Sequence, residues 1–184
     1  RFGRGAVVAL PRPGAGRGFV AERIERSNQA GEAFFGQNAG AIAACAAAMA
    51  DRFFAGATLL VFGSGPHATD AQHNAVEYVH PVLPGCRALP SLSLTNDIGT
   101  VTGMLQSEEA ADVYAHQLRV LGRRGDIALG FAHAPVHPSI ARAMQAAADG
   151  GMLTVSLTSG DIERSADLAE FAFHVPATAR STAH

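Results

Sequence analysis

Cysteine and charged residues are scarce in this 184-residue sequence, and it has no long uninterrupted apolar run. The two cysteines, Cys45 and Cys86, stand far apart without metal or redox spacing, which predicts free thiols in a reduced, cytoplasmic setting. A formal net charge of -2 gives no reason to expect nucleic acid or an anionic membrane as a partner. The most apolar stretch, 39–50, is short and is followed by Asp51 and Arg52, so we expect no membrane-spanning segment.

Apolar residues make up 48% of the chain and charged residues 16%, which is typical of one globular domain with a sizeable core. We assign this domain to residues 19–184. Residues 1–18 are rich in glycine, proline and arginine and have little apolar periodicity, so we expect a flexible arm there. Because the chain begins with Arg1 and not with methionine, we expect its true start to be missing or processed.

Apolar periodicity predicts two leading helices, at 19–35 and 38–54, with Gly36 ending the first and Asn38 capping the second. Nearly continuous apolar strands then alternate with helices, which is typical of a parallel sheet covered on both faces. We therefore predict an α/β fold with a five-stranded parallel sheet and flavodoxin-like winding. The predicted strands are 58–62, 88–94, 126–131, 152–157 and 171–175, the predicted helices are 69–79, 108–121 and 138–148, and one helical turn is expected at 161–166.

The segment 58–80 reads as a buried strand, a glycine turn and a helix that carries His73 and Glu77. Four residues are about one helical turn, so both side chains project from one face, close to the strand end where α/β sheets bind ligands. The turn has a G-x-G but no third glycine, and no acidic residue ends the second strand, so we expect neither a nicotinamide nor a flavin nucleotide. The glycine turn can still offer N–H groups to an anion such as a sugar phosphate.

From residue 22 onward, the order of motifs resembles a sugar isomerase (SIS) domain, and within it the sedoheptulose 7-phosphate isomerases, also called phosphoheptose isomerases. The segments that carry the resemblance are AGATLLVFGSG, DAQHNAVE, LSLTND, GRRGDIALG and ADGGMLTVSLTSGD, and D-A-Q-H-x-x-x-E at 70–77 is the most specific. The resemblance implies a ketose–aldose isomerase that acts on a small sugar phosphate. It implies that His73 and Glu77 help to hold a divalent metal, usually zinc, and that Glu77 moves the proton. It also implies assembly through the first helices, as a homotetramer, or as a dimer if the last helix is absent.

The two loops that bind phosphate in that family differ here. After the first strand, Pro66 removes one N–H group and His67 replaces a serine; after the third strand, 132–137 contains no hydroxyl. We predict substrate contacts from Ser64, Gly65, His67, Asn96, Asp97, His133 and Ser139.

Histidines take the place of the lost hydroxyls, and five are expected around one crevice: His67, His73, His80, His133 and His137. Three interpretations stay open. The phosphate site has been lost, or protonated histidines hold an anion, or neutral imidazoles form a metal site.

Several other residues leave alternatives open. Asp97 either contacts the ligand or forms an ordinary turn. His116 and Gln117 are expected at the surface or in an interface. The family's last helix carries a glutamine and a histidine that complete the metal site, whereas here Thr182 stands where the glutamine would be expected and the chain stops at His184. We expect that helix to be missing from the sequence or absent from the protein.

The competing function is a non-catalytic SIS module that binds a small ligand or a protein partner, and a histidine-rich metal site is a third hypothesis.

Overall fold

The computed structural model of the chain describes residues 16–106, 110–160 and 168–175. Five parallel strands form one sheet in the order β2-β1-β3-β4-β5. The strands are β1 (Leu59–Gly63), β2 (Ser91–Ser93), β3 (Ile127–His133), β4 (Leu153–Ser159) and β5 (Phe171–Val175). This is the strand order of flavodoxin-like sheets, so the predicted fold class is confirmed.

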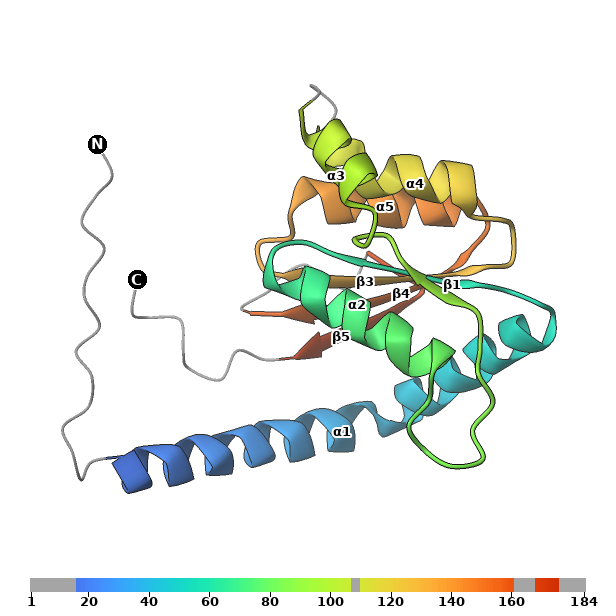
Figure 1. The fold of residues 1–184 in the computed structure, drawn as a ribbon. Coiled ribbons are helices and arrows are strands. Elements are labelled where there is room, and N and C mark those ends of the chain that lie inside the picture. Colours follow the sequence, from blue (N-terminus) through green and yellow to red (C-terminus); the bar gives the residue numbers. More distant parts are fainter. Residues whose placement is uncertain (1–15, 107–109, 161–167, 176–184) are drawn as a thin grey trace, which may run out of the picture.

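Helices cover both faces of the sheet, as expected for strands that are apolar on both sides. In Figure 1, one side carries α3, α4 and α5 and the other side carries α1 and α2. Phe62 and Leu118 belong to the core under α4 and α5, and Val61 and Ala71 belong to the core under α1 and α2. The helices are α1 (Gly16–Phe54), α2 (Pro66–Val79), α3 (Ile98–Leu105), α4 (Val113–Leu121) and α5 (Pro138–Asp149).

The prediction of two leading helices is wrong, because α1 is a single helix of 39 residues. Gly36 lies inside it. A glycine in a helix interior costs only about 1 kcal/mol relative to alanine, and alanine-rich neighbours favour continuation. Asn38 does not cap a new helix either. Its side-chain amide donates to the carbonyl of Phe34, one turn earlier, at 2.8 Å.

The length of α1 also bears on the expectation about membrane-spanning segments. By length and composition, Gly18–Phe54 could cross a membrane: an 18-residue window of it has a mean hydropathy of 1.3, and 11% of that window is buried. The alanine-rich stretch passes this test because Gly36 does not divide the helix, and the test alone does not decide between a membrane and a protein surface. An exposed apolar helix of this kind suits either a membrane or a second protein chain.

Two further boundaries differ from the predicted ones. No helix or strand was predicted between residues 94 and 108, but α3 forms there, and its Val101 and Met104 pack against the core. The helix predicted at 108–121 is a 3-10 turn, Ala110–Asp112, followed by α4. At α3 a local polar start, the Asp97 cap, marks the helix, and this is a weaker signal than apolar periodicity.

Parts of the predictions fall on residues outside the described ranges. These are the helical turn expected at 161–166 and most of the arm expected at 1–18. The last three residues of that arm, 16–18, are helical.

Gln117 was expected at the surface or in an interface but is buried inside the fold, whereas its neighbour His116 is exposed. The Gln117 amide donates to the carbonyl of Leu94 at 3.1 Å and to that of Val113 at 3.0 Å. It thereby ties α4 to the chain that leaves β2. A buried amide is stable only with partners of this kind, which the sequence alone does not reveal.

The end of β1 is held closely against the start of α2. A Cβ atom at Gly63 would collide with the backbone carbonyl of His67, so only glycine allows this approach. On the other side, the buried hydroxyl of Tyr114 donates to the carbonyl of Gly63 at 2.6 Å. These two contacts fix where the turn between β1 and α2 points.

We expect Tyr114→Phe to lower the free energy of unfolding by about 1–3 kcal/mol, because the buried carbonyl of Gly63 loses its hydroxyl partner. Urea denaturation measures this. Tyr78→Phe is the matched control, since the described residues provide no hydrogen bond to the Tyr78 hydroxyl. Equal stability of the two variants would contradict the role given to Tyr114.

Candidate functional site

A cavity of about 350 Å³ opens at the carboxyl edge of the sheet. Its walls come from the ends of β1, β3 and β4 and from the first turns of α2 and α5, which is the edge where parallel α/β sheets bind ligands. The lining residues are Ser64, Pro66, His67, Phe131, Ala132, His133, His137, Ile140 and Ser159. Four of these residues are polar and were predicted for the site: Ser64, His67, His133 and His137.

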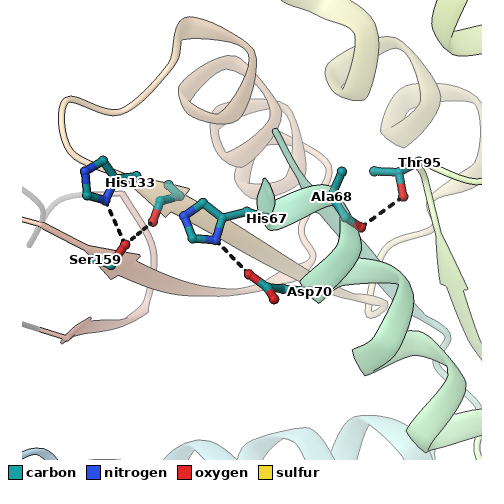
Figure 2. A network of polar contacts seen from close by, with 7 residues as sticks. His67, Ala68, Asp70, Thr95, His133 and Ser159 are labelled. Carbon is teal, nitrogen blue, oxygen red and sulfur yellow. Dashed lines mark hydrogen bonds and ion pairs between the residues drawn. The ribbon is translucent and has the colours of Figure 1, made fainter. Parts of the chain in front are cut away.

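Two histidines of the cavity are held by polar neighbours, as Figure 2 shows. The Nδ1 atom of His67, in the first turn of α2, lies 2.8 Å from the carboxylate of Asp70. The Nδ1 atom of His133, at the end of β3, lies 2.9 Å from the hydroxyl of Ser159 on β4. The two ring centroids are 6.4 Å apart, so the imidazoles face the same small space.

Two hydroxyl groups lie next to the third histidine of the cavity. The Ser64 and Ser139 hydroxyls lie 3.1 Å apart, and the hydroxyl of Ser139 is 2.9 Å from Nδ1 of His137. His137 is also the N-cap of α5, because its ring nitrogen accepts from the N–H of Ser139. Ser139 is almost completely buried. The predicted contribution of Ser64 and Ser139 to one site is therefore structurally consistent.

His73 and Glu77 do not line this cavity. They lie on α2 with Nε2 and Oε1 3.7 Å apart, and 74% of the His73 side chain and 38% of the Glu77 side chain are exposed. The buried side of the helix carries Ala71 and Ala75, so the pair points away from the sheet. From His67 to Glu77 the helix rises by about 15 Å. A ligand that reaches both must be elongated and lie along α2.

Asn96 and Asp97 also lie outside the cavity lining. Asn96 is exposed. Asp97 is the N-cap of α3, where its carboxylate accepts from the backbone N–H of Thr100 at 3.1 Å and from its hydroxyl at 2.8 Å. The backbone hydrogen bond first, and then the hydroxyl, lower the pKa of the Asp97 carboxyl. Of its two interpretations, the capping turn accounts for every contact the structure gives it.

Gly65 lies at the mouth of the turn as the N-cap of α2, with a φ of 61°. It is exposed and leaves the backbone accessible to a ligand. Pro66 follows at the first helical position, where a missing N–H costs the helix nothing but removes one donor from the turn.

The expected crevice of five histidines is smaller than predicted. His67, His133 and His137 line the cavity, whereas His73 points outward and His80 is the C-cap at the far end of α2. Among the described residues, no group of three or more His, Cys, Asp or Glu side chains could hold a metal ion. The described part of the chain therefore lends the metal interpretation of the histidines no support, and that interpretation stays a prediction.

Ser159 was not predicted as a site residue. In the parallel register its Cα is the direct partner of that of His133, and its hydroxyl reaches the ring. The signal was present as a polar end to the fourth strand. Only the register with β3 shows which residue that serine meets.

A parallel sheet of this order, with a cavity at its carboxyl edge that is lined in part by polar side chains, is typical of α/β proteins that bind a small ligand at that edge. The family model described as SIS domain matches residues 24–159, and the chain belongs to this family.

Its relatives include several phosphoheptose isomerases. The enzyme of Roseiflexus sp. is 34% identical over 76% of this chain and 71% of its own length, and that of Thermodesulfovibrio yellowstonii is 29% identical over 85% and 78%. Among solved structures, the phosphoheptose isomerase of Neisseria gonorrhoeae superposes with a TM-score of 0.77 and 25% identity, over 88% of this chain and 86% of that one.

We expect Asp97→Ala to lower stability without weakening the binding of inorganic phosphate, because Asp97 caps α3 and does not line the cavity. Asp97→Asn is the matched control, since asparagine is an equally good N-cap. The pKa of Asp97 lies below its ordinary value of 3.8 in the folded protein. Its charge therefore stabilises the fold above that pH, and this stability is lost as the pH falls through the folded-state pKa.

Urea denaturation at neutral and at acidic pH measures both effects, and calorimetric titration measures phosphate binding. A loss of phosphate affinity with unchanged stability would place Asp97 in the site after all.

Proposed function

We propose that the chain is a phosphosugar isomerase of the phosphoheptose isomerase type, which interconverts a ketose and an aldose by proton transfer. The observation that carries the proposal is the His73–Glu77 pair, kept in its D-A-Q-H-x-x-x-E setting on the helix whose first turn lines the cavity. Membership of the SIS family and relatives named phosphoheptose isomerase support it.

The geometry suggests how the chain's own residues would act. The anionic end of a sugar phosphate would occupy the cavity, and the sugar chain would extend along α2 towards Glu77. A carboxylate can remove the proton from the carbon next to a carbonyl and return it to the former carbonyl carbon. The hydroxyl proton of the first carbon passes to the former carbonyl oxygen, and the two transfers together convert one sugar into the other. His73, one turn before Glu77, would fix the orientation of that carboxylate.

A divalent metal such as zinc stays a prediction at this pair. His73 and Glu77 supply two potential ligands, which is fewer than a structural or catalytic zinc site uses, and the described residues offer no third. The residues described here do not by themselves fit a metal, so no step of the proposed mechanism passes through one.

We also propose that the protein works as a cytoplasmic homotetramer or dimer assembled through α1. The apolar side chains that pack on the sheet from the second half of α1, such as Ile42 and Met49, continue on the same side of the helix as exposed Val20 and Ile24. Between α1, α2 and the sheet there is an apolar groove of about 920 Å³. A second copy laid against this helix would cover both features.

The alternative is a non-catalytic SIS module that binds a ligand or a partner. The observation in its favour is the exposure of His73 and Glu77, because a solvated i,i+4 pair on a helix is common without any function. Proton exchange separates the two functions, since a binding module would not catalyse it.

We expect Glu77→Gln to slow solvent deuterium incorporation into sedoheptulose 7-phosphate by at least about a hundredfold, because the amide cannot act as a base. Nuclear magnetic resonance measures the exchange, and circular dichroism checks the fold. Glu170→Gln, which changes an exposed carboxylate next to β5, is the control. Elemental analysis of untagged protein in the same preparations reports whether Glu77 holds a metal. Exchange that continues at the original rate in the Glu77 variant would remove it from the mechanism.

We expect Val20→Glu combined with Ile24→Glu to reduce the assembly to a smaller species, because both would bury a charge in the interface. Light scattering after size exclusion measures the mass. Glu22→Gln combined with Arg26→Gln changes the opposite side of α1, where these two side chains pair with each other, and should leave the mass unchanged. A monomeric original protein would reject the assembly, and solubility only in detergent would favour the membrane interpretation of α1.

A further inference from the structure

Positive side chains gather at the amino edge of the sheet, which is opposite the cavity. The sequence contains no lysine, and five of its fourteen arginines lie at this edge. Two of them are in the last turns of α1 and α4, and three are in the loops that lead into β2 and β3. The five residues are Arg52, Arg87, Arg119, Arg123 and Arg124. We call the surface that they form the arginine edge.

Close contacts bring three of these arginines together. A Cβ atom at Gly125 would lie 3.7 Å from Nη1 of Arg52, so this guanidinium from α1 lies beside the loop that carries Arg123 and Arg124. The N–H of Gly125 donates to the carbonyl of Gly151 at 3.1 Å, and the Arg124 side chain packs on Gly151. In Figure 1 the ends of α1 and α4 lie at the same edge of the sheet, at the right.

The positive charge of the arginine edge is not neutralised by the fold. Among the described residues, none of the five arginines forms an ion pair. Asp126 lies at this edge too, but it is buried and its two carboxylate oxygens accept from backbone N–H groups. Asp51 and Asp149 are the exposed carboxylates nearby in the chain. The edge therefore has a surplus of positive charge, although the net charge of the whole chain is -2.

The helix ends explain only part of this charge. Helices α1, α2, α4 and α5 all end at the amino edge, and the partial negative charge of a helix end favours a cation in the last turn. This accounts for Arg52 and Arg119. Arg87, Arg123 and Arg124 lie in loops beyond the helix ends and are exposed, where a cation gains little from the helix.

Apolar side chains are exposed next to the arginines. Phe54, two residues after Arg52, is 87% exposed, and Val120 and Leu121 at the end of α4 are 68% and 48% exposed. A surface that combines cations with projecting apolar side chains is suited to an anionic bilayer. There the lipid phosphates meet the cations and the acyl region takes up the apolar groups. Arginine is well suited to this role, because its guanidinium can donate two parallel hydrogen bonds to one phosphate.

We propose that the arginine edge binds the surface of an anionic lipid bilayer, peripherally and reversibly. A nucleic acid or an acidic peptide would also neutralise the arginines, but it would leave Phe54, Val120 and Leu121 without an apolar partner. The cavity lies at the other edge of the sheet, so it would face away from the bilayer and stay open to water. The first half of α1 also projects away from the arginine edge (Figure 1), so assembly through that half does not compete with lipid binding.

The test is co-sedimentation of the full chain with two kinds of lipid vesicle. One kind is pure phosphatidylcholine, and the other contains about one third phosphatidylglycerol, which makes its surface anionic. We expect binding to the anionic vesicles only, and we expect it to weaken as the salt rises from about 0.05 M to about 0.5 M, because salt screens the charges. Equal binding to both kinds, or no binding to the anionic kind at low salt, would overturn the proposal.

Variants assign the binding to residues. Arg123→Gln combined with Arg124→Gln should weaken it about thirtyfold, because each arginine near an anionic surface contributes about a factor of five. Arg23→Gln combined with Arg26→Gln removes the same charge near the other end of α1. It should leave the affinity nearly unchanged, because those positions are several Debye lengths away. Thermal unfolding confirms that each variant is folded. A folded Arg123 and Arg124 variant with the original affinity would overturn the proposal.

A further variant and two soluble polyanions identify the class of partner. Phe54→Ser should weaken binding to the anionic vesicles and keep its salt dependence, because it removes an apolar contact and no charge. Full affinity in this variant would overturn the assignment to lipid. A single-stranded oligonucleotide and polyglutamate are the polyanions. If the arginines bind either of these and the original protein does not bind vesicles, the partner is a nucleic acid or an acidic protein and the lipid proposal is wrong.

Discussion

The parallel register of β1, β3 and β4 is the constraint on which the site depends. It places Gly63 beside Phe131 and His133 beside Ser159, although these residues are far apart in the chain. Strands that run in one direction end at one edge, so their loops and the helices that follow meet there. The cavity, its histidines and its hydroxyls all result from this arrangement. A shift of β3 by one residue would turn His133 to the other face.

The sequence predicted the architecture well because the strands are apolar on both faces and alternate with helices. It failed at α1, where a single glycine was read as a helix end. One glycine destabilises a helix by about as much as a few residues of high helix propensity stabilise it. The residue at one position therefore does not determine whether the helix ends there. It failed at Gln117 for a different reason, because the carbonyl of Leu94 that satisfies its amide comes from another part of the fold.

The site was predicted in part. Ser64, His67, His133 and Ser139 come together as expected because each follows a strand or starts a helix at the carboxyl edge. Spacing along α2 did not predict where His73 and Glu77 lie relative to the cavity. His73 and Glu77 share a face with each other, but that face is directed away from the sheet. A helical spacing predicts which residues are neighbours and leaves open what they face.

A histidine at position 137 also changes how the first N–H groups of α5 are satisfied. Because His137 caps α5 with its own ring, the start of that helix is satisfied without a ligand. The start of α5 therefore offers few free N–H groups to a ligand in the cavity.

The first half of α1 extends past the edge of the sheet at which the cavity opens (Figure 1). A second copy that covers this helix would therefore also stand next to the cavity and the exposed pair on α2. Association and the enclosure of the site would then be one event, so the fraction of chains with a closed site would depend on how concentrated the protein is. Dilution would act on such a protein as an inhibitor does.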